Sequence, residues 1–289
     1  MTSTSKTLKP KADRPVDPVT LSVIRAIQLA SLEFGFPVFI VGATARIILL
    51  ENIFGLNAGR ATRDVDFAFA LEDWDQFRAI KQYLVTNLTF QESDRTAHRL
   101  LFNSPELAHK ITVDLIPFGK IETESNKIAW PPDMDVIMNV AGFSDALSAA
   151  IPVEVSPGLT ILVASIPGIA ILKLFAWVDR GQENPKDAAD LVSLLRGYHE
   201  AGNGDRIYED ASAALESNSF DIELTGAWLL GSDAAVLTSV RIRTELRALL
   251  ESGKRSRLAE DMARAMHGRE GSLEYAQTLL EQFTKGFTS

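Results

Sequence analysis

The chain has 289 residues, of which 46% are hydrophobic and 23% charged, a composition that is typical of a globular protein and excludes a disordered or collagen-like chain. Lys and Arg number 29 and Asp and Glu number 38, so the formal net charge is −9, which excludes a protein that binds nucleic acid with its whole surface but allows a local basic patch. The absence of Cys excludes disulfides, thiolate metal sites and cysteine nucleophiles. Together with the absence of a secretory signal, it predicts a cytoplasmic location.

Hydrophobic patterning divides the chain into three parts. We expect a flexible tail over residues 1–18, an α/β part over 19–158 and a helical part over 159–289. In the α/β part, the patterns predict helices over 19–34, 43–54 and 73–86 and strands over 36–41, 64–70, 88–93, 98–103 and 111–118. This order predicts an α+β (α/β) fold, in which a lobe built on a mixed sheet is followed by a mostly helical C-terminal lobe.

The remaining segments are less regular or continuously apolar. Residues 119–158 have no clear period, so we interpret them as a loop with a helix over 132–140. The apolar stretch 159–178 is long enough to cross a membrane, but Pro167 and Lys173 interrupt it. We interpret it as a strand over 159–163 and a buried helix from Pro167, and expect no membrane partner. Further helices are predicted over 185–200, 205–217, 221–230, 234–252, 256–267 and 272–286.

The segment RDVDFAF is the most informative one for chemistry. Successive side chains of a strand point to opposite faces, so Asp64 and Asp66 share one face while Val65 and Phe67 share the other. Two neighbouring carboxylates repel each other unless a cation or basic groups compensate them. Mg²⁺ prefers such oxygen ligands, and Mn²⁺ is an alternative, although a solvated strand face gives the same pattern.

Two further segments strengthen the metal interpretation. The strand ITVDLIPF places Asp114 among apolar residues, where a charge needs a metal or a basic partner. Upstream, VGATAR lies at a strand-to-helix junction, where Gly42 allows a phosphate to approach the backbone and the helix N-terminus supplies N–H donors. Either feature alone is common, but their order along the chain is more specific.

The order VGATAR, RDVDFAF and VDLIPF resembles the nucleotidyltransferase superfamily that includes DNA polymerase β and the aminoglycoside nucleotidyltransferases. By this resemblance Asp64 and Asp66 are the paired metal-binding carboxylates, and Asp114 is the third metal-binding and catalytic carboxylate. The chain departs from the family pattern at Gly42-Ala43, where the family has Gly-Ser or Gly-Gly, so Thr44 is left as a substitute hydroxyl. The interval of 21 residues between Gly42 and Asp64 is also long.

A segment in the helical part narrows the resemblance. Residues 171–195 place Lys173 and Arg180 on one helix face and Lys186, Asp187 and Asp190 on the next helix. A helical hairpin held by surface ion pairs is the simplest interpretation. The pattern K-L-x-A-x-x-D-R-x-x-x-x-x-K-D-x-x-D-L nevertheless looks like the third motif of the AbiEii/AbiGii toxin-type nucleotidyltransferases, bacterial proteins that are paired with an antitoxin.

This second resemblance implies a nucleotide bound between two lobes. By match of positions, Lys173 contacts nucleotide phosphates, and Asp187 or Asp190 orients the base, the ribose or Lys173. The turn residues Gly42, Ala43 and Thr44 bind the nucleotide, and Arg46 and Arg63 either contact phosphates or compensate the charge of the aspartates.

The resemblance also implies an activity and partners. The expected function is Mg²⁺-dependent transfer of a nucleoside monophosphate from an NTP to RNA, with tRNA as the acceptor and an antitoxin as partner. The alternatives are transfer to a protein or small-molecule hydroxyl, which the acidic net charge favours, and a non-catalytic nucleotide-binding module. If RNA binds, residues 241–257 and the Arg60–Arg63 loop are the expected phosphate contacts.

Overall fold

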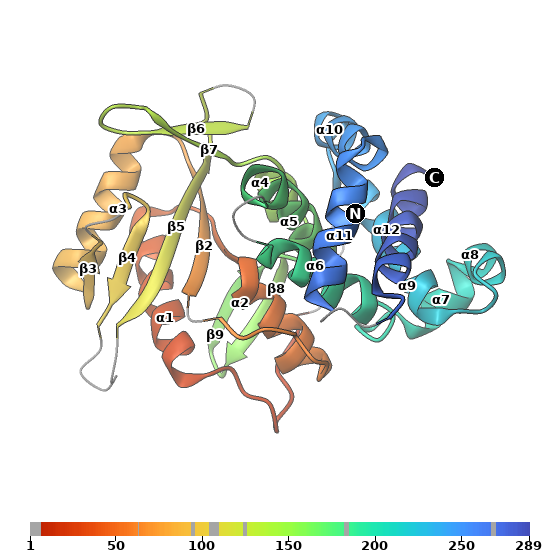
Figure 1. Ribbon diagram of the computed structural model, residues 1–289. Helices are drawn as coiled ribbons and strands as arrows, with labels where there is room; N and C mark the ends of the chain where they lie inside the picture. The colour runs from red at the N-terminus through yellow and green to blue at the C-terminus, as the bar shows by residue number, and fades with distance from the viewer. Residues whose placement is uncertain are drawn as a thin grey trace.

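The computed structural model describes residues 7–62, 64–93, 96–103, 110–123, 126–181, 185–266 and 270–289. Figure 1 shows a part built around a sheet on one side and a bundle of helices on the other, with helix α5 (Ile166–Arg180) between them. Helix α5 contacts α2, α4, α6, α9 and β7, so it joins the two parts.

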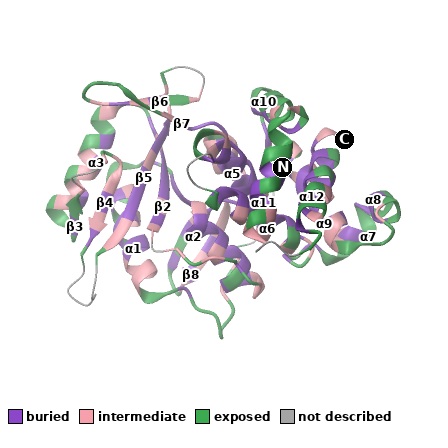
Figure 2. Cartoon of the chain, in the orientation of Figure 1, coloured by how far each residue is buried: buried purple, intermediate pink, exposed green. Residues whose placement is uncertain are grey.

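Seven strands form one mixed sheet in the order β3-β4-β5-β2-β1-β9-β8. The pairs β2–β5 and β1–β9 are parallel and the other neighbours are antiparallel, so the mixed sheet predicted from the sequence is confirmed. Strands β2 and β5 lie at its buried centre (Figure 2). The strand bounds are β1 Val38–Val41, β2 Asp64–Leu71, β3 Phe90–Glu92, β4 Arg99–Phe102, β5 Ile111–Gly119, β8 Ile151–Ser156 and β9 Leu159–Val163.

Helices α1 (Pro18–Phe34) and α3 (Trp74–Asn87) begin at the caps that the sequence contains. The carboxylate of Asp17 accepts the backbone N–H of Thr20, and that of Asp73 accepts the backbone N–H of Gln76. The helix predicted over 43–54 is divided into α2 (Gly42–Ile47) and a π-helical segment, η1 (Ile48–Phe54), which ends at the left-handed Gly55. π-Helical segments are rare and have no distinct hydrophobic period, so this one could not be predicted from the sequence.

The prediction of a loop with a helix over residues 132–140 is wrong. Strands β6 (Lys127–Trp130) and β7 (Val136–Asn139) form a two-stranded hairpin apart from the main sheet, followed by helix α4 (Phe143–Ser148) and strand β8. Each hairpin strand has only four residues. The apolar residues at the start of β7 follow one another without a break, because they face a cavity and not the core. The period-2 signal of a strand is therefore missing from β7.

The helical part follows the prediction with three differences. The helix predicted over 205–217 is divided into α7 and α8, and the helix predicted over 234–252 is interrupted at residues 238–239, between α9 and α10. Helix α9 continues through residues 231–233, where a break was predicted, because Gly231 does not end a helix here. A Cβ at Gly231 would overlap the backbone carbonyl oxygen of Phe283, so this glycine allows α9 and α12 to pack closely. The bounds are α6 Lys186–Gly197, α7 Gly204–Glu209, α8 Ser212–Ser217, α9 Ile222–Leu237, α10 Val240–Glu251, α11 Lys254–Ala265 and α12 Ser272–Thr288.

The predicted boundaries of the three parts differ from the packing. In residues 7–17, where a flexible tail was predicted, Leu8 pairs with strand β8 and Lys11 donates to the carbonyl of Phe54 at 2.9 Å, so this segment lies against the edge of the sheet. Strand β9, assigned to the helical part, lies inside the main sheet. One hydrophobic cluster runs from Val16 to Phe287 and includes both parts.

The apolar stretch 159–178 forms β9 and most of α5, as predicted. Within the described ranges, no helix combines the length and the apolar character that crossing a bilayer requires.

Candidate active site

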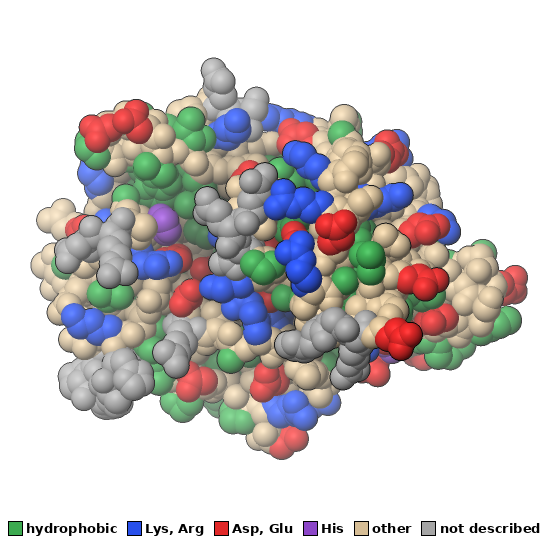
Figure 3. Space-filling model, viewed as in Figure 1, with side chains coloured by type: hydrophobic (Ala, Val, Ile, Leu, Met, Phe, Trp, Pro, Cys, Tyr) green, Lys and Arg blue, Asp and Glu red, His purple; other side chains and the backbone are tan. Residues whose placement is uncertain are grey.

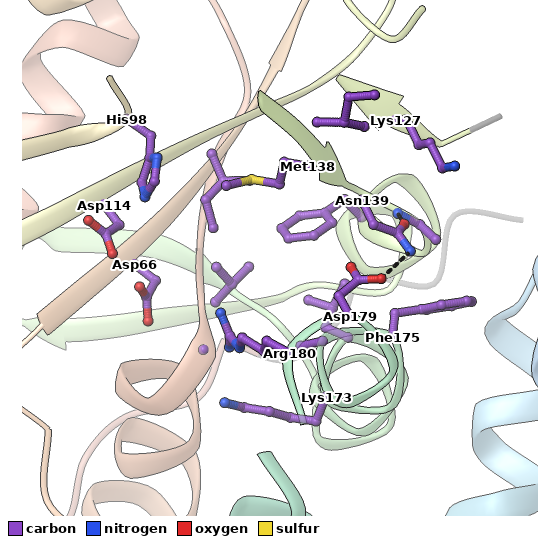
Figure 4. A pocket seen from close by; sticks show the side chains of 18 of the residues that line it. Asp66, His98, Asp114, Lys127, Met138, Asn139, Lys173, Phe175, Asp179 and Arg180 are labelled. Carbon is purple, nitrogen blue, oxygen red and sulfur yellow. Dashed lines mark hydrogen bonds between the residues drawn. The ribbon is translucent and has the colours of Figure 1, made fainter. Parts of the chain in front are cut away.

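Two aspartates lie side by side in the wall of a cavity between the two parts. The parallel register of β2 and β5 sets Asp66 opposite Asp114. The cavity has a volume of about 570 Å³, and both aspartates line it together with Lys173 and Arg180 from α5 (Figure 4). In Figure 3 the corresponding face shows a hollow lined by hydrophobic side chains, with Lys and Arg side chains gathered between the two parts of the molecule.

Gly42 makes room for the Asp66 carboxylate. It has a φ of 66°, in the left-handed region, and a Cβ at this position would overlap Asp66 Oδ2. The glycine at the strand-to-helix junction therefore serves the close approach of a side chain from the neighbouring strand. Burial, and next the charge of Asp114, raises the pKa of Asp66 to about 6.

Asp114 has a basic partner that the sequence did not identify. Arg99 on β4 donates Nε and Nη2 to the two carboxylate oxygens of Asp114, both at 2.8 Å. This hydrogen-bonded pair raises the pKa of Arg99. His98 lies next to it and lines the same cavity, and burial lowers the pKa of its imidazole. The sequence signal that could have revealed Arg99 is the succession of the two predicted strands over 98–103 and 111–118. Paired as antiparallel neighbours, as β4 and β5 are, they bring Arg99 opposite Asp114.

Asp64, Ala43 and Thr44 lie outside the cavity lining, whereas Gly42 is part of it. Thr44 is buried and its hydroxyl donates to the backbone carbonyl of Asp64 at 3.0 Å, so it fixes the helix start to β2. Ala43 is also buried. In the part of the chain that the structure describes, no three side chains of His, Asp or Glu lie close enough together to hold a metal ion.

Two buried aspartates on α6 hold the cations of α5. Lys173 Nζ lies 2.9 Å from Asp187 Oδ1 and 2.6 Å from Asp190 Oδ2, and both aspartates are 1% exposed. Arg180 donates Nε to Asp187 Oδ2 at 2.8 Å. Burial opposes the ionisation of Asp187, but the hydrogen bond from Arg180 and the charge of Lys173 together keep its pKa below the usual value. The spacing that suggested surface ion pairs thus produces a buried network.

Arg46 completes this network from behind the cavity. Its side chain is 0% exposed, lies 3.3 Å from Asp190 Oδ1 and donates to the backbone carbonyl of Arg60 at 2.9 Å. Arg60 itself lies 3.2 Å from Asp190. The structure therefore places Arg46 where it supports Asp190 and Lys173, and not where it lines the cavity. Arg63 lies outside the described residues.

The geometry combines opposite charges across one cavity. In the α6 network four cations (Arg46, Arg60, Lys173 and Arg180) share two carboxylates, which leaves an excess of positive charge. Asp66 and Asp114 lie on the other side of the cavity. Among the described residues, Arg99 is the only cation that forms a salt bridge with either of them, and its partner is Asp114. Such an arrangement can hold a polyanion on one side and a divalent cation on the other.

The far wall of the cavity was missed from the sequence. It consists of apolar and polar residues from the hairpin and from α5, namely Val136, Ile137, Met138, Asn139, Phe175 and Asp179. Asp179 is the aspartate of the D-R pair in the third motif, but no role was assigned to it. The hairpin positions carry no recognisable motif, and the hairpin itself was not predicted. In Figure 4, Asn139 and Asp179 lie together, away from Asp66 and Asp114.

Comparison with known proteins identifies the family. The profile described as "Nucleotidyl transferase AbiEii toxin, Type IV TA system" matches residues 37–282, which is most of the chain. No curated protein matches.

Several solved structures are similar at low identity. The antibiotic-resistance factor ANT(2'')-Ia has 16% identity and a TM-score of 0.38 over 71% of this chain and 98% of its own. An antigenic nucleotidyltransferase-like protein from Paracoccidioides brasiliensis has 17% identity and a TM-score of 0.41, over 70% of this chain and 94% of its own. A CCA-adding enzyme solved with ATP has 11% identity and a TM-score of 0.25, over 94% of this chain and 71% of its own.

The family match confirms the resemblance seen in the sequence motifs, and it covers both the paired aspartates of β2 and the charged network of α5 and α6. The chain is a nucleotidyltransferase and belongs to the AbiEii toxin family of type IV toxin–antitoxin systems.

Proposed function

We propose that the protein transfers a nucleoside monophosphate from an NTP to an RNA acceptor, with tRNA as the foremost candidate and Mg²⁺ as the cofactor, and that an antitoxin restrains this activity. The observation that carries the proposal is the cavity in which Asp66 and Asp114 face Lys173 and Arg180. Carboxylates suit a divalent cation and the cations suit a triphosphate, so one cavity offers both halves of the charge pattern of a metal nucleotide.

The reaction needs one bond formed and one broken. The oxygen of an acceptor hydroxyl bonds to the α-phosphorus of the NTP, the bond from that phosphorus to the bridging oxygen of the β-phosphate breaks, and pyrophosphate leaves. The hydroxyl proton passes to a carboxylate, a role that we assign to Asp114. Each oxygen of Asp114 accepts one hydrogen bond from Arg99, so the acceptor hydroxyl would approach a remaining lone pair of this carboxylate.

The donor set suits Mg²⁺ in charge and in atom type. Burial, and next the charge of Asp114, raises the pKa of Asp66, and the charges of Lys173 and Arg180 offset this only in part. Among the described residues, Arg99 is the cation that pairs directly with Asp114. Asp66 and Asp114, which line the cavity, would hold the ion, or Mn²⁺ in its place, and Asp64 would have to move toward the cavity to become a third ligand. When bound, the ion neutralises charge on the triphosphate and on the leaving pyrophosphate.

Lys173 and Arg180 are the proposed contacts for the phosphates. Asp187 positions both of them, Asp190 positions Lys173, and Arg46 supports Asp190. We assign Gly42 to the nucleotide site because it lines the cavity, whereas Ala43 and Thr44 shape the helix start behind it. Preorganised positive charge of this kind stabilises negative charge that develops during transfer.

The route of an RNA acceptor to the cavity is supported by charge near its mouth. Arg180 is 59% exposed and lines the cavity, and Lys127 lines it from the hairpin. On α10, the segment singled out in the sequence, Arg241 and Arg247 pair with glutamates of the same helix, Glu245 and Glu251. This pairing favours Lys127 as the first contact for an RNA phosphate, whereas Arg180, which pairs with Asp187, is assigned to the phosphates of the NTP.

A label-transfer experiment tests the acceptor. Purified protein and its Asp66→Ala variant are incubated with each α-labelled NTP, Mg²⁺ and either total tRNA, a protein extract or aminoglycosides. We expect label on tRNA with the wild type alone and a steep fall of RNA binding with salt. Label on protein or on the small molecule would instead support the alternative that the net charge of −9 favours, and NTP binding without transfer would support a non-catalytic module.

A further inference from the structure

The cavity ends in a pair of polar side chains that the proposed transfer does not use. Asn139 Oδ1 accepts the backbone N–H of Ala141 at 2.8 Å, and Asn139 Nδ2 donates to Asp179 Oδ1 at 3.4 Å. Because a backbone N–H can only donate, Ala141 fixes the orientation of the Asn139 amide, and that amide in turn holds one oxygen of Asp179. Asp179 Oδ2 receives no hydrogen bond from the residues that the structure describes.

The walls next to this pair are apolar. Met138 and Phe143 line the cavity. Figure 4 shows Met138 between the Asn139–Asp179 pair and the two aspartates Asp66 and Asp114. An aromatic ring and a thioether provide the kind of surface against which a planar base packs. A polar group at the end of such a slot can distinguish one base from another by hydrogen bonding to the groups on the edge of the base.

The position of Asp179 along α5 fits an elongated ligand. Lys173 and Asp179 are six residues apart, so their backbones are separated by about 9 Å along the helix axis. A nucleoside triphosphate carries its charge at one end and its base at the other. With the phosphates at Lys173, the base therefore extends toward Asp179.

We propose that Asp179, held in place by Asn139, reads the base of the bound nucleotide by accepting a hydrogen bond from an amino group of that base. This inference rests on the proposed function, because it places an NTP in the cavity. It implies a preference for adenine, cytosine or guanine nucleotides over uracil nucleotides.

The preference follows from the chemistry of a carboxylate, which only accepts hydrogen bonds when ionised. Cytosine carries an amino group where uracil carries a carbonyl oxygen, so uracil would present an acceptor to an acceptor. A site built around a hydrogen bond rejects the analogue that lacks it, because the polar group is then left without its partner. Burial raises the pKa of Asp179, whereas the hydrogen bond from Asn139 and the charges of Arg180 and Lys127 favour its ionised form.

Nucleotide binding tests this inference without requiring transfer. Equilibrium dialysis with Mg²⁺ compares CTP with UTP and ATP with ITP, because each pair differs by an amino group replaced with a carbonyl oxygen. We expect the wild type to bind the amino-bearing member about 10-fold to 100-fold more tightly. In Asp179→Asn we expect the two members to bind within about threefold, because a carboxamide can present either a donor or an acceptor.

Two further variants separate base reading from structure. Asp135→Asn makes the same charge change on the hairpin but lies outside the cavity lining, so the preference should stay intact. Asn139→Ala removes the tie between hairpin and helix but keeps the carboxylate, so affinities should fall while the preference remains. An unchanged preference in Asp179→Asn, or an equal loss of it in Asn139→Ala or Asp135→Asn, would overturn the inference and leave the proposed function standing. Absence of NTP binding by the wild type would overturn the proposed function itself.

Discussion

Asp66 lies between Gly42, whose absent side chain makes room for its carboxylate, and Asp114, whose charge faces it. Burial and this charge raise the pKa of Asp66 from 3.8 to about 6. The folded state therefore binds the proton more tightly than the unfolded chain does. The contribution of this group to stability is greatest below pH 4 and is lost as the pH rises to 6.

Replacing this charge should stabilise the protein at neutral pH. We expect Asp66→Asn to raise the free energy of unfolding at pH 7 by on the order of 2 kcal/mol and to leave it unchanged near pH 4. Urea denaturation at pH 4, 5, 6 and 7 in EDTA measures this difference. A variant that is equally stable or less stable than the wild type at pH 7 would show that the charge of Asp66 is already compensated.

Arg99 donates hydrogen bonds to both carboxylate oxygens of Asp114, so it competes with the proposed metal ion for this carboxylate. We expect Arg99→Gln to lower the free energy of unfolding in EDTA by about 1 kcal/mol, since the side chain of Arg99 is 35% exposed and its pairing is screened. The variant should also bind Mn²⁺ more tightly than the wild type, measured by electron paramagnetic resonance, because two carboxylates are then left without a cation. Weaker Mn²⁺ binding would mean that Arg99 does not compete for this position.

At the scale of elements, the junction between β1 and α2 determines how close the start of α2 lies to Asp66. Gly42 and Gly158 both have positive φ, 66° and 75°, but only Gly42 has an atom within 4 Å of the added Cβ. They therefore form a matched pair that separates backbone strain from the close approach to Asp66.

We expect Gly158→Ala to cost about 1 kcal/mol of stability and to leave transfer intact. Gly42→Ala should cost more and reduce transfer at least ~100-fold, because it displaces a carboxylate from the reacting centre. Urea denaturation and single-turnover transfer measure both effects. Equal activity in the two variants would contradict the account of this junction.

The elements that could be predicted from the sequence are those with a strong period or a recognisable cap. Helix α3 begins at Asp73 and strand β2 follows the alternation of RDVDFAF, as expected. The hairpin β6–β7 could not be predicted, because each strand has only four residues and the apolar residues of β7 face the cavity. The far wall of the cavity was missed for the same reason.

At the scale of the whole molecule, the sheet part and the helical part are held together by buried charges as well as by one core. Arg46 on α2 and Asp190 on α6 lie 3.3 Å apart, with exposures of 0% and 1%. The motifs predicted that these residues belong to one site. They could not reveal that Arg46 lies behind the cavity, because burial depends on how α2 packs against α5 and α6.

We expect the protein to unfold in one cooperative transition, since the two parts share a core and a buried ion-pair network. Differential scanning calorimetry should give a ratio of calorimetric to van't Hoff enthalpy of about 1. Two separated transitions would instead support the division into independent domains at residue 158.

The most direct test of the whole account is the fate of the α-phosphate. The wild type, Asp66→Asn and the control Asp135→Asn are incubated with tRNA, Mg²⁺ and an NTP labelled at the α-phosphate or at the γ-phosphate. We predict that the α-label is transferred to RNA and that the γ-label is released in pyrophosphate by the wild type and the control, and that Asp66→Asn does neither. Transfer of the γ-label, or full activity in Asp66→Asn, would contradict the assignment of nucleotidyl transfer to this cavity.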